Sequence, residues 1–253
     1  MSFVSSHHPQ ALVFDLMGTC TDWKTSICTA LSQSPSLGPR LEAKQAQFAA
    51  DWRAGFFDEI HARFQSGAGS EDIDLTHRRV LDRLLRQYGI EDALVDEMER
   101  EKLVLSWHSQ VAWPDAVEAI SQLKEKYTVV VLANGTTRLQ LDIIRSSGLP
   151  FHTLFSSQLL GLTKPDPAIY RKGLDLLQVP PHEAAMVAAH AYDLRAAKQV
   201  GMRTIYIRRD TEDPDENMDL VRRDVDLFLN HDSSQDAGRG PLVKLADHLL
   251  QTM

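Results

Sequence analysis

The feature of this sequence that most constrains its fold is the alternation of short apolar segments with helical segments after residue 113. Tyr127–Leu132 is a continuous apolar, valine-rich run, which is typical of a strand covered on both faces. Further strands are predicted at residues 153–156, 184–189 and 204–207, and helices at 115–126, 137–147, 166–177, 193–200 and 242–250. This alternation predicts an α/β fold with a parallel sheet and right-handed crossovers.

A separate short strand is predicted near the start of the chain, at Ala11–Phe14. It ends at Asp15 and is followed by a Gly18-Thr19 turn. No other strand is predicted before residue 113, so we expect this strand to join the same doubly wound, Rossmann-like sheet. Open α/β sheets bind ligands at the carboxyl ends of their strands, which makes Asp15 a candidate nucleophile or proton-transfer group.

The region between the first strand and the rest of the sheet is predicted to be helical. Apolar residues recur at helical spacing in Phe48, Trp52, Phe56 and Ile60, and again between Val80 and Tyr88. We therefore expect two domains. Residues 1–20 and 112–253 would form the α/β core, and residues 21–111 a helical cap domain inserted after the Asp15 strand.

Composition narrows the class of protein. Acidic residues outnumber basic ones by 35 to 27, giving a net charge of −8, which argues against a broad nucleic-acid-binding face. Two cysteines are too few for a disulfide framework. There is no signal-peptide pattern and no apolar stretch near the ~20 residues that span a bilayer. We expect a cytoplasmic enzyme acting on a small molecule, with no membrane or nucleic-acid partner.

Four polar features follow successive predicted strands. They are Asp15, Asn134, Lys164 and the pair His190 with Asp193. Each is a weak signal alone, since Asn-Gly is usually a turn and Lys before Pro is usually a solvated loop residue. In a doubly wound sheet all four would meet in one crevice, where the lysine would hold Asp15 ionised.

In these motifs the chain resembles the haloacid dehalogenase (HAD) superfamily of hydrolases. Asp15-x-x-Gly18-Thr19 is similar to the first motif of that superfamily, Asn134 to the second, Lys164-Pro165 to the third and Asp193 to the fourth. Within the superfamily the sequence is most similar to the type II, (S)-2-haloacid dehalogenases. Trp52-Arg53 and Pro165-x-Pro-x-x-Tyr170 match positions of that branch.

The resemblance implies a metal-independent reaction at carbon. Asp15 would displace halide from a 2-haloacid, and water would hydrolyse the resulting ester. Thr19 would orient Asp15, Lys164 would keep it charged, and Arg53 with Asn134 would receive the halide. Leu16 and Met17 would contact the substrate, and Tyr170 and Asp193 would complete the polar floor. Arg53 also fits a surface helix position, and Tyr170 a structural role. Members of this branch often pair, so a homodimer is possible by analogy.

A magnesium-dependent phosphatase is disfavoured by two positions. Such enzymes need a second aspartate two residues after the nucleophile, where this chain has Met17. They usually also carry an acidic pair in the fourth motif, where this chain has Ala189 before Asp193. Mg²⁺ prefers oxygen ligands, and Met17 and Ala189 both stand where such enzymes have a carboxylate. We therefore expect no metal. We also expect no other cofactor.

Three positions depart from the dehalogenase pattern. Ala133 and Ala188 replace serines, and His190 replaces an asparagine near the hydrolytic water. A less polar pocket with a new acid–base group leaves a second hypothesis open, an enzyme of specialised metabolism that rearranges or cyclises a substrate such as an epoxide. Asp15, His190 and Lys164 would then act as acid–base groups. Aromatic residues, which otherwise form cap core, could line its pocket: Trp52, Phe56, Phe57, Trp107 and Trp113.

Overall fold

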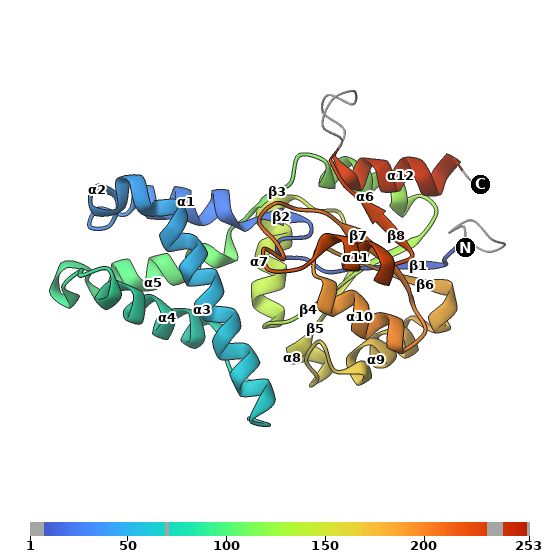
Figure 1. Cartoon of the computed structure of the whole chain (residues 1–253), viewed down its shortest axis with the longest axis horizontal. Helices are drawn as coiled ribbons and strands as arrows, with labels where there is room; N and C mark the ends of the chain where they lie inside the picture. Colours follow the sequence, from blue (N-terminus) through green and yellow to red (C-terminus); the bar gives the residue numbers. More distant parts are fainter. Residues whose placement is uncertain (1–7, 69–70, 232–239, 252–253) are drawn as a thin grey trace. The chain divides into compact units, whose positions relative to one another are not determined.

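The computed structural model describes residues 8–68, 71–231 and 240–251. The chain divides into two compact units, one of Met1–Asp22 with Ala112–Met253 and one of Trp23–Val111. We call them the sheet unit and the helical unit. The short strands β2 (Thr21–Asp22) and β3 (Val111–Ala112) pair where the chain passes from one unit to the other. Figure 1 gives the order of the elements along the chain.

The sheet unit is built on one six-stranded sheet in the order β5-β4-β1-β6-β7-β8, and all its strand pairs are parallel. The predicted α/β doubly wound fold is confirmed. The strands are β1 (Ala11–Phe14), β4 (Thr128–Ala133), β5 (Thr153–Ser156), β6 (Ala184–Ala188), β7 (Arg203–Ile207) and β8 (Leu227–Leu229). Strand β8 was missed because the mixed run after residue 208 has no clear period-2 pattern.

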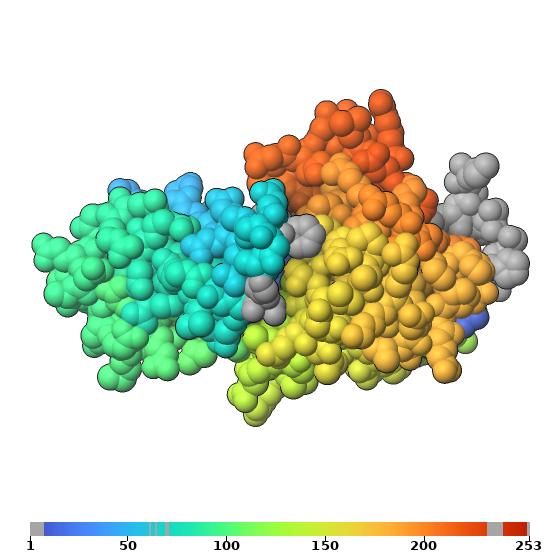
Figure 2. All heavy atoms as spheres, turned by 90° about the horizontal axis from the view of Figure 1, so that it is seen from below, coloured from blue at the N-terminus to red at the C-terminus, as the bar shows by residue number. Residues whose placement is uncertain are grey.

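Helices lie on both faces of this sheet (Figure 1). They are α6 (Ala116–Lys124), α7 (Thr137–Ser147), α8 (Ser157–Leu160), α9 (Pro167–Leu177), α10 (Ala191–Gln199), α11 (Met218–Asp224) and α12 (Pro241–Gln251). Buried residues of α9 and α10 form one core cluster with Val13, Val130 and Met186 of the sheet. In Figure 2, the segments coloured yellow to orange, which include α9, form a continuous outer surface of this unit.

Strand register explains why polar residues gather at one edge of the sheet. Phe14 is aligned with Val131 on one side and Val187 on the other. The residues after these three strands therefore emerge at the same level. The chain ends each strand with a turn or a helix start, and the side chains at these positions point into a common region.

The helical unit contains α1 (Trp23–Gln33), α2 (Gly38–Leu41), α3 (Gln45–Gln65), α4 (Ile73–Gln87) and α5 (Glu97–Leu105). Its core is aromatic. Trp52 and Trp107 are fully buried with ring centroids 5.4 Å apart, and the ring of His77 stacks on Trp107 at 4.4 Å. Trp113, grouped with the cap aromatics in the sequence, instead belongs to the sheet unit.

Candidate active site

Asp15 lies directly after β1, and its side chain is almost completely buried. Its backbone N–H donates to Val187 O at 3.0 Å, which continues the pairing with β6 for one residue beyond the strand. Its carboxylate accepts three hydrogen bonds from side chains. Oδ1 accepts from Lys164 Nζ at 2.8 Å, while Oδ2 accepts from Thr19 Oγ1 at 2.7 Å and contacts His190 Nδ1 at 3.0 Å. A buried carboxylate requires this kind of compensation to stay ionised.

The direction of the Thr19 hydrogen bond is fixed by the backbone. The N–H of Ala189 donates to Thr19 Oγ1 at 2.9 Å, so the threonine hydroxyl is free to donate to Asp15. The turn that carries Thr19 is held at two carbonyls. Trp113 Nε1 donates to Gly18 O at 2.8 Å, and Arg209 Nε donates to Thr19 O at 3.2 Å. Thr19 is therefore a well-fixed donor to Oδ2.

Lys164 bridges the two buried aspartates of the site. Its Nζ lies 2.8 Å from Asp15 Oδ1 and 2.5 Å from Asp193 Oδ2, and the residue is only 3% exposed. The other oxygen of Asp193 accepts from the Tyr170 hydroxyl at 2.5 Å. Asn134 fixes the Lys164 backbone at both ends, accepting from its N–H at 2.8 Å and donating to its carbonyl at 3.0 Å. The structure thus gives Asn134 a positioning role that the sequence did not predict.

His190 lies between two carboxylates. Its Nδ1 faces Asp15 Oδ2, and its Nε2 is 2.8 Å from Glu212 Oε2. His190 and Glu212 are 5% and 3% exposed, so both hydrogen bonds are shielded from water. With an acceptor on each side, the imidazole satisfies both contacts only when both ring nitrogens carry protons. The geometry therefore describes an imidazolium between two carboxylates.

The charges of the site support one another. Burial alone would raise the pKa of Asp15, but the ammonium of Lys164 and the contact with His190 hold that pKa well below its usual range. Burial opposes the charge of Lys164, and the carboxylates of Asp15 and Asp193 nevertheless raise its pKa. For His190, burial would lower the pKa, but hydrogen bonds to Asp15 and Glu212 raise it to about 10. Asp15, Lys164 and His190 are all charged at neutral pH.

Asp193 and Tyr170 form a deeply buried part of the site, at 0% and 1% exposed. Burial holds the pKa of Asp193 above its usual value, although Lys164 acts in the opposite direction. Burial, followed by the Asp193 carboxylate, raises the pKa of the Tyr170 phenol. The phenol therefore stays protonated and serves as a hydrogen-bond donor to Asp193, as a buried tyrosine commonly does.

The remaining positions predicted in the sheet unit lie close to Asp15 in the chain or at neighbouring strand ends. Leu16 is buried and Met17 half-buried, immediately after the carboxylate. Ala133 ends β4, and Ala188 ends β6 with its surface fully covered. Neither alanine carries a hydrogen-bonding side chain. The polar side chains described in contact with the Asp15 carboxylate are therefore those of Lys164, Thr19 and His190.

Arg53 belongs to the helical unit and lies on α3. Its guanidinium carbon is 5.3 Å from the ring centroid of Trp23 and 4.6 Å from that of Phe57. The residue is 7% exposed, so the interpretation of Arg53 as an ordinary surface helix residue is wrong. Aromatic faces commonly hold an arginine in this way without neutralising its charge.

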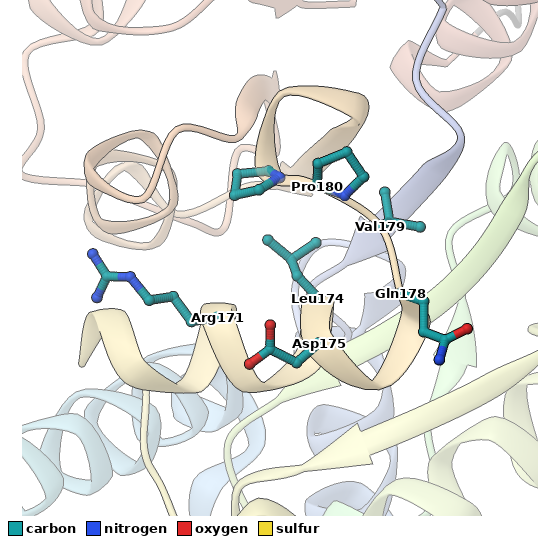
Figure 3. Close-up of a pocket in the computed structure, with 7 residues that line it drawn as sticks. Arg171, Leu174, Asp175, Gln178, Val179 and Pro180 are labelled. Atoms are coloured by element: carbon teal, nitrogen blue, oxygen red, sulfur yellow. The ribbon is translucent and has the colours of Figure 1, made fainter.

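Another hollow on the sheet unit is distinct from this site. It is lined by the end of α9 and the following loop, including Leu174, Gln178 and Pro180 (Figure 3). The loop leads into the amino end of β6, whereas Asp15 contacts the segment after the carboxyl end of β6. The hollow therefore lies at the opposite edge of the sheet.

Comparison with known proteins assigns the family. The model of haloacid dehalogenase-like hydrolases matches residues 9–201. The chain belongs to this family of hydrolases. It is 28% identical over 214 residues to (S)-2-haloacid dehalogenase 4A of Burkholderia cepacia, covering 81% of this chain and 86% of that protein. It is 27% identical over 204 residues to (S)-2-haloacid dehalogenase 1 of a Pseudomonas species, covering 79% and 85%.

Solved structures agree with the sequence comparison. An L-2-haloacid dehalogenase superposes with a TM-score of 0.80 at 30% identity, covering 96% of this chain and 99% of that one. A defluorinating L-2-haloacid dehalogenase also gives 0.80, at 29% identity and 98% coverage of both chains. Within the HAD-like hydrolases, the chain therefore falls in the 2-haloacid dehalogenase branch. No helix in the part of the chain that the structure describes is long and apolar enough to span a membrane.

Sequence reasoning missed one acidic member of the site, Glu212. The sequence pattern predicts no role for the segment from Asp210 to Asn217. Glu212 follows β7, however, and β7 is the parallel neighbour of β6. The rule that identified the other site residues, a polar side chain shortly after a buried strand, also applies to this position.

Proposed function

We propose that this hydrolase displaces halide from the carbon of a short 2-haloacid, with the Asp15 carboxylate as nucleophile. The observation that carries the proposal is the asymmetry around that carboxylate. In the described part of the chain, Oδ2 has two side-chain partners, Thr19 and His190, while Oδ1 has Lys164. Oδ1 is therefore the oxygen with more lone-pair capacity for attack.

The first half-reaction is a substitution at carbon. A lone pair of Asp15 Oδ1 forms a bond to the halogen-bearing carbon, and the carbon–halogen bond breaks as halide leaves with its electron pair. The product is a neutral ester on Asp15. Lys164 contributes by keeping the carboxylate ionised in a buried site, since a protonated acid would be a poor nucleophile.

In the second half-reaction, water hydrolyses the ester. The water oxygen bonds to Cγ of Asp15, and the bond between Cγ and Oδ1 breaks, so the 2-hydroxy acid leaves with Oδ1. One proton of the water ends on that hydroxyl, and the other is released to solvent as Asp15 returns to a carboxylate. The regenerated carboxylate contains one oxygen from water.

The other site residues have supporting roles in this proposal. Arg53 and Asn134 receive the halide, as the resemblance to the dehalogenases implies, because a permanently charged guanidinium suits an anionic leaving group. Leu16 and Met17 contact the substrate. Asp193 and Tyr170 hold Lys164 in place through the contacts described above.

A phosphatase reaction has less support from these residues. Met17 cannot act as the acid that protonates a leaving alcohol, and Ala189 cannot ligate a metal. The rearrangement hypothesis is likewise less well supported, because the similar proteins reported above are 2-haloacid dehalogenases by both sequence and structure. The experiment below separates dehalogenation from phosphate-ester hydrolysis.

The direct test is halide release from (S)-2-chloropropionate with and without added Mg²⁺. We expect wild-type protein to release halide without Mg²⁺, and Asp15→Asn to lose this activity. Asp175→Asn is a matched control on the exposed surface of α9 and should behave as wild type. Magnesium-dependent cleavage of p-nitrophenyl phosphate without halide release would refute the proposal in favour of a phosphatase.

A further inference from the structure

The Asp15 carboxylate is held by two donors on one oxygen, and this arrangement has a consequence for the second half-reaction. Thr19 Oγ1 and His190 Nδ1 lie 2.7 and 3.0 Å from Oδ2. Both distances fall within the ~2.7–3.1 Å range of donors that stabilise an oxyanion. If Oδ1 attacks, Oδ2 becomes the carbonyl oxygen of the ester, and both donors still point at it.

The charge on Oδ2 changes during the cycle. Before alkylation the oxygen shares a full negative charge, and in the ester it is a neutral carbonyl oxygen. When water adds to Cγ, the negative charge returns to Oδ2 in the tetrahedral intermediate. A cationic donor aimed at Oδ2 stabilises the free carboxylate and the tetrahedral intermediate more than the ester between them. Such a donor therefore lowers the barrier to hydrolysis without helping alkylation.

We propose that Thr19 and the imidazolium of His190 form the oxyanion site for hydrolysis of the Asp15 ester, with Glu212 holding His190 in place. This inference rests on the proposed function and extends it to the second half-reaction. His190 is the catalytic residue, since it touches the oxygen that gains charge. Glu212 is a positioning residue, since it acts through the other nitrogen of the ring.

Electron and proton balance are simple in this step. The carbonyl π electrons move onto Oδ2 as the water oxygen bonds to Cγ, and they return as the Cγ–Oδ1 bond breaks. His190 keeps both of its protons and only donates a hydrogen bond. The two protons of the water go to the departing hydroxyl and to solvent, as in the overall reaction above.

The Glu212 carboxylate is well placed to keep the ring charged and oriented. It accepts at 2.8 Å from Nε2, and its Oε1 accepts from the Thr211 hydroxyl at 2.8 Å. Space for the carboxylate comes from Gly18, because a Cβ at that position would lie 2.4 Å from Glu212 Cδ. Gly18 also has φ +83°, a conformation that side chains disfavour. The absence of a side chain at Gly18 thus leaves the room that the Glu212 carboxylate occupies.

Two substitutions of His190 separate the contacts of its two nitrogens. In His190→Asn, the amide nitrogen can take the place of Nδ1 and donate an uncharged hydrogen bond to Oδ2. In His190→Gln, the amide nitrogen can take the place of Nε2, so the Glu212 contact is kept and the donor to Oδ2 is lost. The experiment is rapid-quench kinetics with (S)-2-chloropropionate, in which halide and the mass of the Asp15 peptide are followed together.

We expect His190→Gln to slow ester hydrolysis by about 100-fold or more, in the range found when an oxyanion donor is removed. Alkylation should change much less. The variant should therefore give a halide burst stoichiometric with enzyme, and the alkylated Asp15 peptide should accumulate. His190→Asn should lie between wild type and His190→Gln. Glu212→Gln should lower the pKa of His190, measured by nitrogen NMR, and slow hydrolysis while leaving the burst phase intact.

Two outcomes would overturn the inference. One is a His190→Gln variant that hydrolyses the ester at the wild-type rate. The other is a variant that slows alkylation and hydrolysis equally, which would show that His190 only supports the fold or the nucleophile. Failure of the proposed function is distinguishable, because wild-type protein would then release no halide and show no alkylated Asp15.

Discussion

Replacing Lys164 with methionine should have a large effect, because its ammonium is the shared cation of two buried carboxylates. Methionine keeps a similar length but leaves Asp15 and Asp193 without the contacts at 2.8 and 2.5 Å. Removing one partner of a buried ion pair costs about 3–5 kcal/mol. We therefore expect Lys164→Met to lose about this much unfolding free energy at neutral pH, measured by urea denaturation.

A matched lysine provides the control. Lys172 is exposed, and its Nζ donates to the backbone carbonyl of Leu160 at 2.6 Å. Lys172→Met removes a single hydrogen bond to a neutral acceptor, so we expect a loss of no more than about 1.5 kcal/mol. Both variants remove one ammonium from the same unit, so the difference between them reports the buried carboxylates.

A double variant tests the reasoning behind that magnitude. Lys164→Met with Asp193→Asn removes the cation together with one of the two carboxylates. We expect it to be more stable than Lys164→Met alone, since fewer uncompensated charges remain buried. A double variant as unstable as the sum of the two single variants would refute the account of Lys164 as a charge bridge.

Three further predictions follow from the same contacts. Gly18→Ala should lower activity and stability together by displacing Glu212 and straining the turn, and kinetics with thermal melting would show this; an unchanged melting temperature would contradict it. Thr19→Val should slow hydrolysis of the Asp15 ester about tenfold or more while Thr19→Ser keeps most of the rate, because only the hydroxyl reaches Oδ2. The pKa of His190, raised from 6.5 to about 10, should give stability that is complete below pH 6.5 and lost as pH rises toward 10. Nitrogen NMR should find the ring doubly protonated at pH 8, and a ring neutral at that pH would contradict the charge assignment. The titratable groups around the ring are Asp15 and Glu212 at its two nitrogens, with Tyr192 and Asp213 nearby.

Much of the sheet unit could be predicted from local sequence pattern. The valine-rich run that became β4 has no helical period and no polar face, so a buried strand was the simplest solution. The helix at Thr137–Ser147 was predicted with the same bounds that the structure shows. Its N-cap Thr136 accepts from Leu139 N–H, and Gly148 ends it in a left-handed conformation, which are local signals readable without tertiary contacts.

The gathering of Asp15, Asn134, Lys164 and Asp193 could also be predicted, because strand ends in a parallel sheet share an edge. What could not be predicted was how each group would be used there. The sequence shows Asn134 as a polar residue after a strand, but only the structure shows both ends of its amide on the Lys164 backbone.

The acidic site partner was missed for a different reason. Glu212 lies among several acidic residues, and composition alone gives no reason to choose one of them. Its role depends on the room left by the missing side chain of Gly18, which is nearly two hundred positions away in the chain. Contacts between such distant loops depend on tertiary packing, and local pattern carries no information about them.

The most direct test of the central claim is a single turnover of (S)-2-chloropropionate in water enriched in heavy oxygen. With enzyme in excess, we predict that the heavy oxygen appears in the carboxylate of Asp15, located by mass spectrometry of its peptide, and that the first 2-hydroxy acid formed is unlabelled. Heavy oxygen found in the product but not in Asp15 would mean that water attacks the substrate directly. That result would contradict the assignment of Asp15 as a nucleophile on carbon.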